Sequence, residues 1–344
     1  MRRIILPALS ALALAACQES APVNTPDPSS DDTPPAASQS GETPTMPVTT
    51  SDIETARLLA DGNNTFAWSV YDALEAKPGN VFVSPASISG AFGLLYPGSA
   101  GNTQAQIADL FGFDAVPADA FPAAAYLLSE EIGTDTDKAK LTVANAVWLR
   151  QGSALQAPYR VAVQDIMKAK VELVDFTQPA AAAGLINDWV KAKTNDRIKD
   201  LIPASAIKPQ LTELILTNAV WFKADWKSPF KAEATEDAPF YAPSGERTAK
   251  MMRQTLKKAR YIDGDGYAAL DLDYVGDDYA LTVILPDARD GLSDVAAAMT
   301  PDSFAGLIDD IETAATKRVN VFLPKVKVEA DYQLNDVLIG LGLT

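Results

Sequence analysis

The single cysteine of the chain, Cys17, stands in the setting that most clearly predicts a chemical reaction. Two arginines form a short basic region near the start, and an apolar stretch too short to cross a bilayer as a helix follows them. Leu14-Ala15-Ala16-Cys17 then places small residues directly before the thiol, as a lipoprotein signal peptidase requires. We therefore predict that residues 1–16 are a signal peptide and that Cys17 carries the lipid. The alternative is an ordinary secretory signal with an incidental cysteine.

The segment after Cys17 has the composition of a flexible tether. Residues 18–50 contain seven prolines, eleven Ser or Thr, five acidic residues, and neither basic nor aromatic residues. Such a segment buries too little apolar surface to offset the entropy lost on ordering. We predict a lipidated, disordered tether over residues 17–50, which could hold a domain up to about 100 Å from a membrane. Gln18 in place of Asp resembles the outer-membrane sorting pattern of Gram-negative lipoproteins, so we expect an outer membrane lipoprotein whose domain faces the periplasm or the outside.

Two features of the composition exclude large classes of function. The formal net charge of −16 opposes nucleic-acid binding, and the only membrane contact we expect is the lipid anchor. The chain contains no histidine, which removes Ser-His-Asp and Cys-His nucleophiles and the commonest transition-metal ligand. We predict a protein that is not an enzyme, has no catalytic residues, and needs neither a metal nor a cofactor.

Two short motifs could carry chemistry, and each has a simpler interpretation. Ser205-Ala206-Ile207-Lys208 matches the S-x-x-K pattern of penicillin-binding enzymes, but the prolines on either side of it favour a surface turn. Asp263-Gly264-Asp265-Gly266 resembles a calcium loop, but Tyr274 stands where an EF-hand needs a carboxylate. We expect a polar turn there, followed by a solvated hairpin, with a loose cation site as the alternative. The hairpin would carry Asp271, Asp273, Asp277 and Asp278.

The apolar patterns that must position these residues predict one α+β domain over residues 51–344. Helical spacing predicts a helix at 52–76 and another after Ser84-Pro85, where the serine caps the helix and the proline takes its first position. Short apolar or alternating segments predict strands, which cover 81–83, 141–149, 214–222, 268–272, 279–285 and 319–327.

One of these strands contains an unexpected polar residue. The segment 214–222 is almost continuously apolar, which predicts burial on both faces, yet Asn218 lies in its middle. A buried amide costs several kcal/mol unless it is paired. We therefore expect Asn218 to hydrogen-bond across to a neighbouring element.

Residues 80–89, NVFVSPASIS, form the most specific pattern in the sequence. Further motifs follow: AFG at 91–93, GSAGNT at 98–103, NAVWL at 145–149, INDWV at 186–190, IKDLI at 198–202, TNAVWFKA at 217–224, MM at 251–252, ILP at 284–286 and LPK at 323–325. In their order and spacing these motifs resemble those of the serpins. The resemblance extends over residues 51–344.

The resemblance implies a fold and a mechanism. Serpins are single domains with three β-sheets and surrounding helices, held in a metastable state. A target protease cleaves an exposed reactive loop, and the loop inserts into the large sheet before the acyl-enzyme can be hydrolysed. The expected function is therefore a serine-type endopeptidase inhibitor that acts as a suicide substrate. The expected partner is a serine protease, with a cysteine protease as the second choice, and the inhibitor is expected to be a monomer.

The resemblance also assigns site residues by position. Asn80, Ser84, Ser87 and Asn218 fall on the shutter, the polar cluster beneath the point where the sheet opens, and are expected to act as a conformational switch. Trp226 falls on the breach, where the loop first enters the sheet. The alternative for all five residues is static structural support.

The family pattern continues past the helix expected at 331–342 with further strands and the reactive loop. The reactive-site bond is not present in this chain. We therefore expect a serpin domain without its C-terminal strands and reactive loop, from a fragment or a natural truncation. Two functions stay open for the complete protein: protease inhibition, and a non-inhibitory binding module on the same fold.

Overall fold

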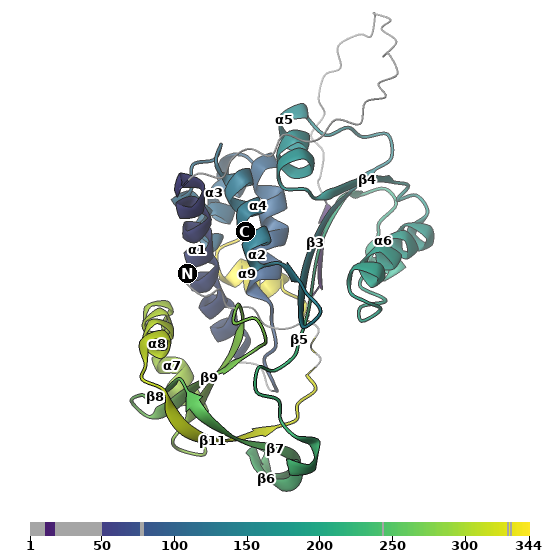
Figure 1. Ribbon diagram of the computed structural model, residues 1–344. Coiled ribbons are helices and arrows are strands. Elements are labelled where there is room, and N and C mark those ends of the chain that lie inside the picture. Colours follow the sequence, from purple (N-terminus) through teal and green to yellow (C-terminus); the bar gives the residue numbers. More distant parts are fainter. Residues whose placement is uncertain (1–10, 18–49, 76–78, 243, 329, 331) are drawn as a thin grey trace, which may run out of the picture.

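Helices and three β-sheets make up the part of the chain that the computed structural model describes, so the α+β prediction is confirmed (Figure 1). The described residues are 11–17, 50–75, 79–242, 244–328, 330 and 332–344. The predicted tether lies outside them except for Cys17 and Thr50.

The largest sheet is built around two long antiparallel strands. Its strands are β1 (Ala11–Cys17), β2 (Thr134–Asp135), β3 (Ala139–Arg150), β4 (Lys170–Val174) and β5 (Thr212–Ala224). β3 lies between β5 and β4, with β4 parallel to it, and β1 pairs antiparallel with the other edge of β5. Residues 215–221 of β5 are all buried, which confirms the prediction of a strand covered on both faces.

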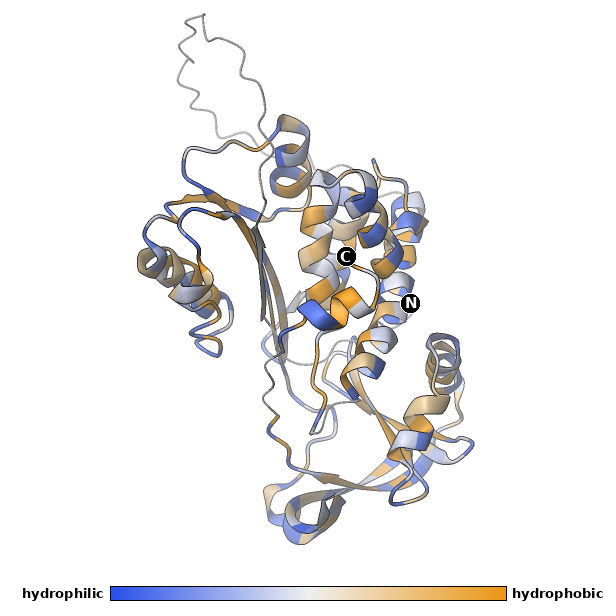
Figure 2. Ribbon diagram, turned by 180° about the vertical axis from the view of Figure 1, so that it is seen from behind, coloured by the Kyte–Doolittle hydropathy of each residue, from blue (hydrophilic) through white to orange (hydrophobic). Residues whose placement is uncertain are grey.

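Helices cover both faces of this sheet (Figure 1). On one side lie α1 (Thr50–Glu75), α2 (Pro85–Leu95), α3 (Gly101–Phe111), α4 (Phe121–Ile132), α5 (Ala157–Arg160), the π-helical turn Val161–Ile166 and α9 (Asn335–Gly340). On the other side lies α6 (Pro179–Lys193). Hydrophobic residues gather where α1–α4 meet the sheet (Figure 2), and the buried Phe111 ring stacks there on Phe92. The main core therefore lies between the helical layer and the β3–β5 face.

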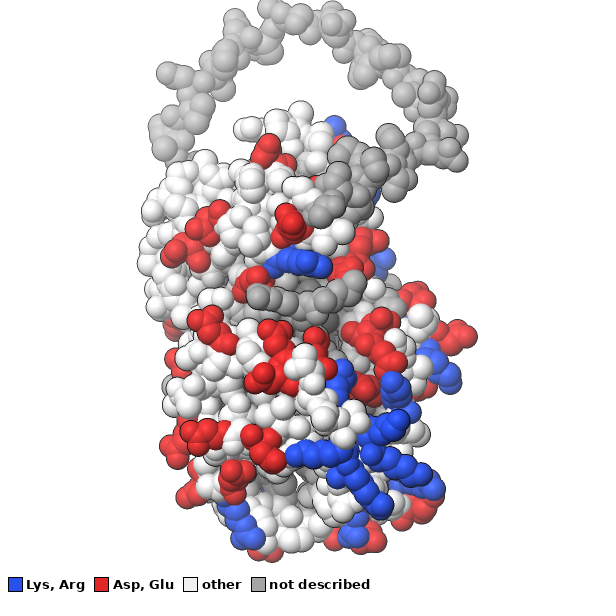
Figure 3. All heavy atoms as spheres, turned by 60° about the vertical axis from the view of Figure 1, so that its left-hand side comes forward, with Lys and Arg blue, Asp and Glu red and all other residues white. Residues whose placement is uncertain are grey.

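Two smaller sheets form the opposite end of the molecule. One has the order β10 (Ala280–Pro286), β9 (Tyr267–Asp273), β8 (Tyr261–Asp263), and the other β11 (Lys317–Pro324), β7 (Gly245–Ala259), β6 (Glu236–Ala242). α8 (Pro301–Thr313) packs on β8 and β9, and α7 (Leu292–Ala298) contacts β10. On the face shown in Figure 3 acidic side chains are spread widely between uncharged residues, and the lysines and arginines gather towards this end.

The strand expected at 81–83 is not formed, and that prediction was wrong. Residues 81–83 are not assigned to a strand and pair with none of the described strands. The backbone N–H of Phe82 donates instead to the hydroxyl of Tyr332, at 2.9 Å. The Tyr332 hydroxyl thus accepts a backbone hydrogen bond that a neighbouring strand would otherwise accept through a carbonyl oxygen.

Asp271 also differs from expectation. We predicted it in a solvated hairpin, but its side chain is buried in β9. Arg260 lies 3.5 Å from its carboxylate, and the hydroxyl of Thr282 donates to it at 2.7 Å. A buried carboxylate requires such partners, and only the pairing of β9 with β10 brings Thr282 to it.

Candidate functional site

A pair of asparagines lies at the centre of the largest sheet. Asn218 of β5 is directly opposite Asn145 of β3, and its amide N–H donates to Asn145 Oδ1 at 2.7 Å. The predicted cross-strand hydrogen bond of Asn218 is therefore confirmed. Asn218 is fully buried. Both side chains face the helical layer, because side chains alternate along a strand and the neighbouring Val147–Leu216 pair packs in that core.

The pairing leaves part of the amide unsatisfied. Among the described residues, Asn218 Oδ1 has no hydrogen-bond partner. Reversing both amides would exchange donor and acceptor, and Asn218 would then hold an unpaired N–H group instead. A buried polar atom without a partner costs about 1–3 kcal/mol. The centre of the sheet is therefore less stable than an apolar pair of the same shape would make it.

Helix α2 packs on β5 and carries two buried serines and a glycine. Ser84 caps the helix as predicted, with its hydroxyl accepting from the Ser87 N–H at 3.3 Å, and both serines are buried. Gly90 lies one turn after Ser87 on the same side of the helix. A Cβ on Gly90 would approach Asn218 Nδ2 to 3.0 Å, so glycine allows the helix to lie against the amide.

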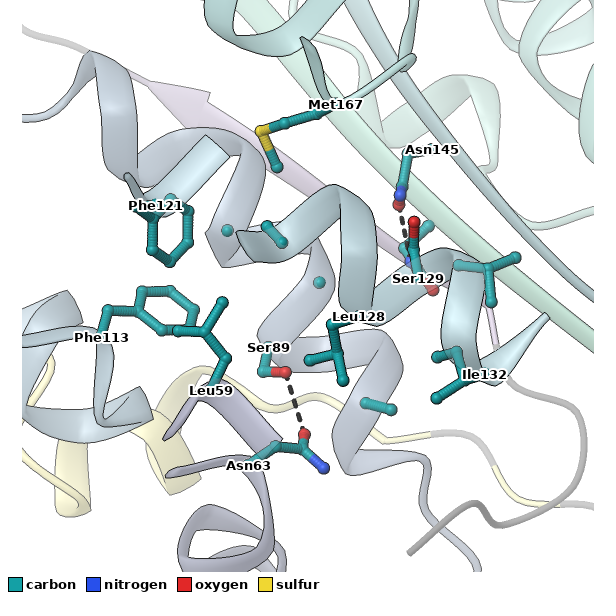
Figure 4. Close-up of a pocket in the computed structure, with 16 residues that line it drawn as sticks. Leu59, Asn63, Ser89, Phe113, Phe121, Leu128, Ser129, Ile132, Asn145 and Met167 are labelled. Carbon is teal, nitrogen blue, oxygen red and sulfur yellow. Dashed lines mark hydrogen bonds between the residues drawn. The ribbon is translucent and has the colours of Figure 1, made fainter. Parts of the chain in front are cut away.

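A second buried amide lies between α1 and α2. The hydroxyl of Ser89 donates to Asn63 Oδ1 of α1 at 2.9 Å, and both residues are buried (Figure 4). Asn63 Nδ2 has no partner among the described residues. We call Asn63, Ser84, Ser87, Ser89, Asn145 and Asn218 together the polar cluster. Its side-chain hydrogen bonds join α1 to α2 through Asn63 and Ser89, and β3 to β5 through Asn145 and Asn218.

The opposite face of the sheet has a different character. Trp148 of β3 is fully buried against α6 and donates its indole N–H to the Thr217 hydroxyl at 3.0 Å. Its ring also meets Trp189 of α6 edge to face, with centroids 5.5 Å apart. Both the indole N–H and the threonine hydroxyl are satisfied, so this face holds β3, β5 and α6 together without a polar defect.

The other residues assigned by position lie outside the polar cluster. The Asn80 side chain is exposed, and its backbone carbonyl is 3.5 Å from the Tyr332 hydroxyl. Trp226 follows the end of β5, where it stacks on Tyr274 with ring centroids 4.4 Å apart. Since a strand rises about 3.3 Å per residue, Trp226 is more than about 20 Å along the chain from Asn218. Of the shutter positions, Ser84 and Ser87 lie on α2 and Asn218 lies on β5, which that helix contacts, whereas the Asn80 side chain is exposed.

The structure gives no support for chemistry at the other sites considered in the sequence, and it does not test the lipid anchor. Cys17 is the last residue of β1, opposite Thr212, and its lipidation stays a prediction. Lys208 Nζ donates to the backbone carbonyl of Ser205 rather than to its hydroxyl, so the two are not arranged as nucleophile and base. In the described residues, no group of three metal-binding side chains occurs and no helix is long and apolar enough to cross a membrane.

Four residues of the site were missed in the sequence: Asn63, Ser89, Gly90 and Asn145. Asn145 alternates with apolar residues along its strand, and that polar interruption was the available signal. Gly90 and Asn63 lie on helices, where a glycine or an asparagine carries no sign of its partner. Only the packing of α1 and α2 on the sheet identifies them.

Comparisons with known proteins agree with this architecture. Residues 61–344 match the family described as serpin (serine protease inhibitor). A serpin-like protein of Thermococcus kodakarensis is 33% identical over 304 residues, which cover 87% of this chain and 69% of that protein. The leukocyte elastase inhibitor of Homo sapiens is 33% identical over 83% of this chain and 76% of that inhibitor.

Solved structures show the same fold. Ovalbumin of the emu, Dromaius novaehollandiae, superposes with a TM-score of 0.77 at 25% identity, over 83% of this chain and 78% of its own. Cleaved lamprey angiotensinogen superposes with a TM-score of 0.74 at 23% identity, over 84% and 85%. The predicted three-sheet fold and the resemblance are thus confirmed, and the chain belongs to the serpin family of serine protease inhibitors.

Proposed function

We propose that the complete protein inhibits a serine protease as a suicide substrate and does so while anchored to a membrane through Cys17. The family is one of protease inhibitors. The observation that carries the mechanism is the polar cluster. Its central amide, Asn218, lies on the face of β5 that meets α2, and the hydrogen bonds of an amide can be exchanged, whereas packing contacts would have to be broken.

The chemistry belongs mainly to the target. The serine hydroxyl of the protease attacks the scissile carbonyl of the inhibitor, an ester acyl-enzyme forms, and the new amine terminus leaves with the proton of the serine. For inhibition, the cleaved loop must insert into the sheet faster than water hydrolyses the ester. The inhibitor needs no general base of its own, which agrees with a chain that contains no histidine.

The test is the formation of a covalent complex. The complete protein, including the reactive loop that the family pattern places after α9, is incubated with serine proteases of different specificity. We expect a complex that survives SDS, and none with a protease whose active-site serine is blocked. Digestion of the loop without complex formation, and without a rise in thermal stability, would contradict the proposal. That outcome would favour the non-inhibitory binding module.

The anchor needs a separate test, because it concerns location and not inhibition. Small residues precede Cys17, and an acidic, proline-rich segment follows it. We expect metabolic labelling with an alkyne fatty acid to mark the protein in cells and the label to disappear in Cys17→Ser. If Cys17→Ser still fractionates with outer membranes and carries label, the lipid anchor is not at Cys17.

A further inference from the structure

A cavity of about 70 Å³ lies between the helical layer and the sheet, next to the polar cluster (Figure 4). Its walls are mostly apolar, and its large apolar lining residues include Leu59, Phe113, Phe121, Leu128, Ile132 and Met167. An engineered cavity of about 150 Å³ holds benzene, so this one has room for about three or four non-hydrogen atoms.

The cavity also has polar lining atoms that lack partners. Asn218 and Asn63 both line it, and their side chains are 0% and 3% exposed. In the described part of the chain, Asn218 Oδ1 is a free acceptor and Asn63 Nδ2 a free donor. An apolar void of this size would stay empty, whereas buried amide atoms favour an occupant that can hydrogen-bond.

The size and the chemistry together define the occupant. It must be neutral, because no charged side chain lines the cavity and a buried ion without a counter-charge is strongly disfavoured. With the amides oriented as in the structure, it carries an N–H or O–H donor for Asn218 Oδ1, and its remaining atoms are apolar enough to contact the phenylalanine and leucine walls.

We propose that this cavity is a binding site for a small neutral molecule of the primary-amide or short-alcohol class, which donates to Asn218 Oδ1. Such a ligand completes the hydrogen bonding of the central amide pair. By satisfying Asn218 it stabilises the closed arrangement of α2, β3 and β5. The site requires no protease, so its test is independent of the proposed inhibition, and either proposal can fail while the other stands.

Gly93 offers a variant that reduces the cavity without disturbing its walls. It lines the cavity, and a Cβ there would lie 3.6 Å from Phe121 Cζ and 3.9 Å from Phe113 Cζ, which is ordinary van der Waals contact. Gly93→Ala therefore adds a methyl group to the space. Gly306→Ala is the matched control, because Gly306 is also helical, exposed, and has nothing within 4 Å of its Cβ position.

The probe is acetamide, added to the full chain. We expect a saturable rise of about 2–4 °C in the unfolding midpoint, and nuclear Overhauser effects from the acetamide methyl to the Met167 and Leu128 methyls. Gly306→Ala should respond as the parent does. Gly93→Ala should bind acetamide at least about tenfold more weakly, because the added methyl group overfills the site.

Two results would overturn the proposal. One is an equal response of the parent, Gly93→Ala and Gly306→Ala, which would mean that acetamide acts as a general cosolvent. The other is the absence of any Overhauser effect to Met167 at saturation, which would mean that the cavity takes water only.

Discussion

Thr217 and Asn218 are neighbours on β5, both fully buried, and they meet opposite environments. Thr217 faces α6 and accepts the indole N–H of Trp148, so that polar pair is complete. Asn218 faces the helical layer, donates to Asn145, and keeps one amide atom without a partner in the described chain. The face of β5 towards α6 therefore has all its buried polar groups paired, whereas the face towards the helical layer contains an unpaired amide atom.

The difference indicates which face of the sheet can rearrange at the lower cost in free energy. Removing the Trp148–Thr217 contact would empty a large, well-packed volume, which costs several kcal/mol. Exchanging the hydrogen bonds of Asn218 costs much less, because a new partner can replace the old one. Under the proposed mechanism, we therefore expect β3, β5 and α6 to move as a unit relative to α2.

The largest expected loss of stability comes from the face of the sheet that packs on α6. Trp148→Ala should lower the free energy of unfolding by about 3–5 kcal/mol, because it leaves a cavity beside α6 and removes the donor to Thr217. Urea unfolding followed by circular dichroism measures the loss. A decrease no larger than that of an exposed substitution would show that the α6 face does not secure the strand.

A smaller loss of stability is expected on the face towards the helical layer, where Asn145 and Asn218 pair. Asn218→Val removes the donor to Asn145 Oδ1 and should cost about 1–3 kcal/mol. The double variant Asn145→Val/Asn218→Val removes both partners and should be nearly as stable as the parent, or more stable. If the double variant instead loses the sum of the single effects, the amide pair stabilises the sheet. In the complete protein, the double variant should also raise the number of inhibitor molecules consumed per protease.

The cap of α2 should contribute less. Ser84→Ala removes the side-chain acceptor for the Ser87 N–H and should cost about 1 kcal/mol in the free energy of unfolding. Ser228 is exposed, and Ser228→Ala should change it by less than about 0.5 kcal/mol. Equal results for both variants would mean that the cap does not hold α2 in place beneath the sheet.

The smallest effect concerns pH. Tyr159 donates to the carbonyl of Leu94 in α2, and burial raises the pKa of its hydroxyl to about 12. The protonated form is favoured in the folded state, so its contribution is complete below the ordinary value of 10.0 and is lost as the pH rises towards 12. Tyr159→Phe should flatten this alkaline decrease. A parallel pH profile for Tyr159→Phe and parent would assign the decrease to other groups, such as Tyr279, whose pKa burial also raises to about 12.

The sequence predicted much of the frame of the site. Ser84 and Pro85 identified the start of α2 because capping and a fixed φ act within one turn. The unbroken apolar run around Asn218 predicted a strand covered on both faces and a paired amide, and both are present. The failures, at 81–83 and at Asp271, occurred where the outcome depended on a partner far along the chain: Tyr332 for the first and Thr282 for the second.

The sequence by itself determined which residues are polar, which positions alternate, and which family the motifs resemble, because these depend on local spacing. Only the tertiary structure showed that Asn145 is the hydrogen-bond partner of Asn218 and that Gly90 lets α2 pack closely against the Asn218 amide. It also showed that Asn80 lies outside the polar cluster. These contacts depend on strand register and helix packing. Asn145 and Asn218, for example, are about 70 residues apart in the sequence. A local pattern carries no information about such a register, so the unpaired atom at the centre of the sheet became visible only in the fold.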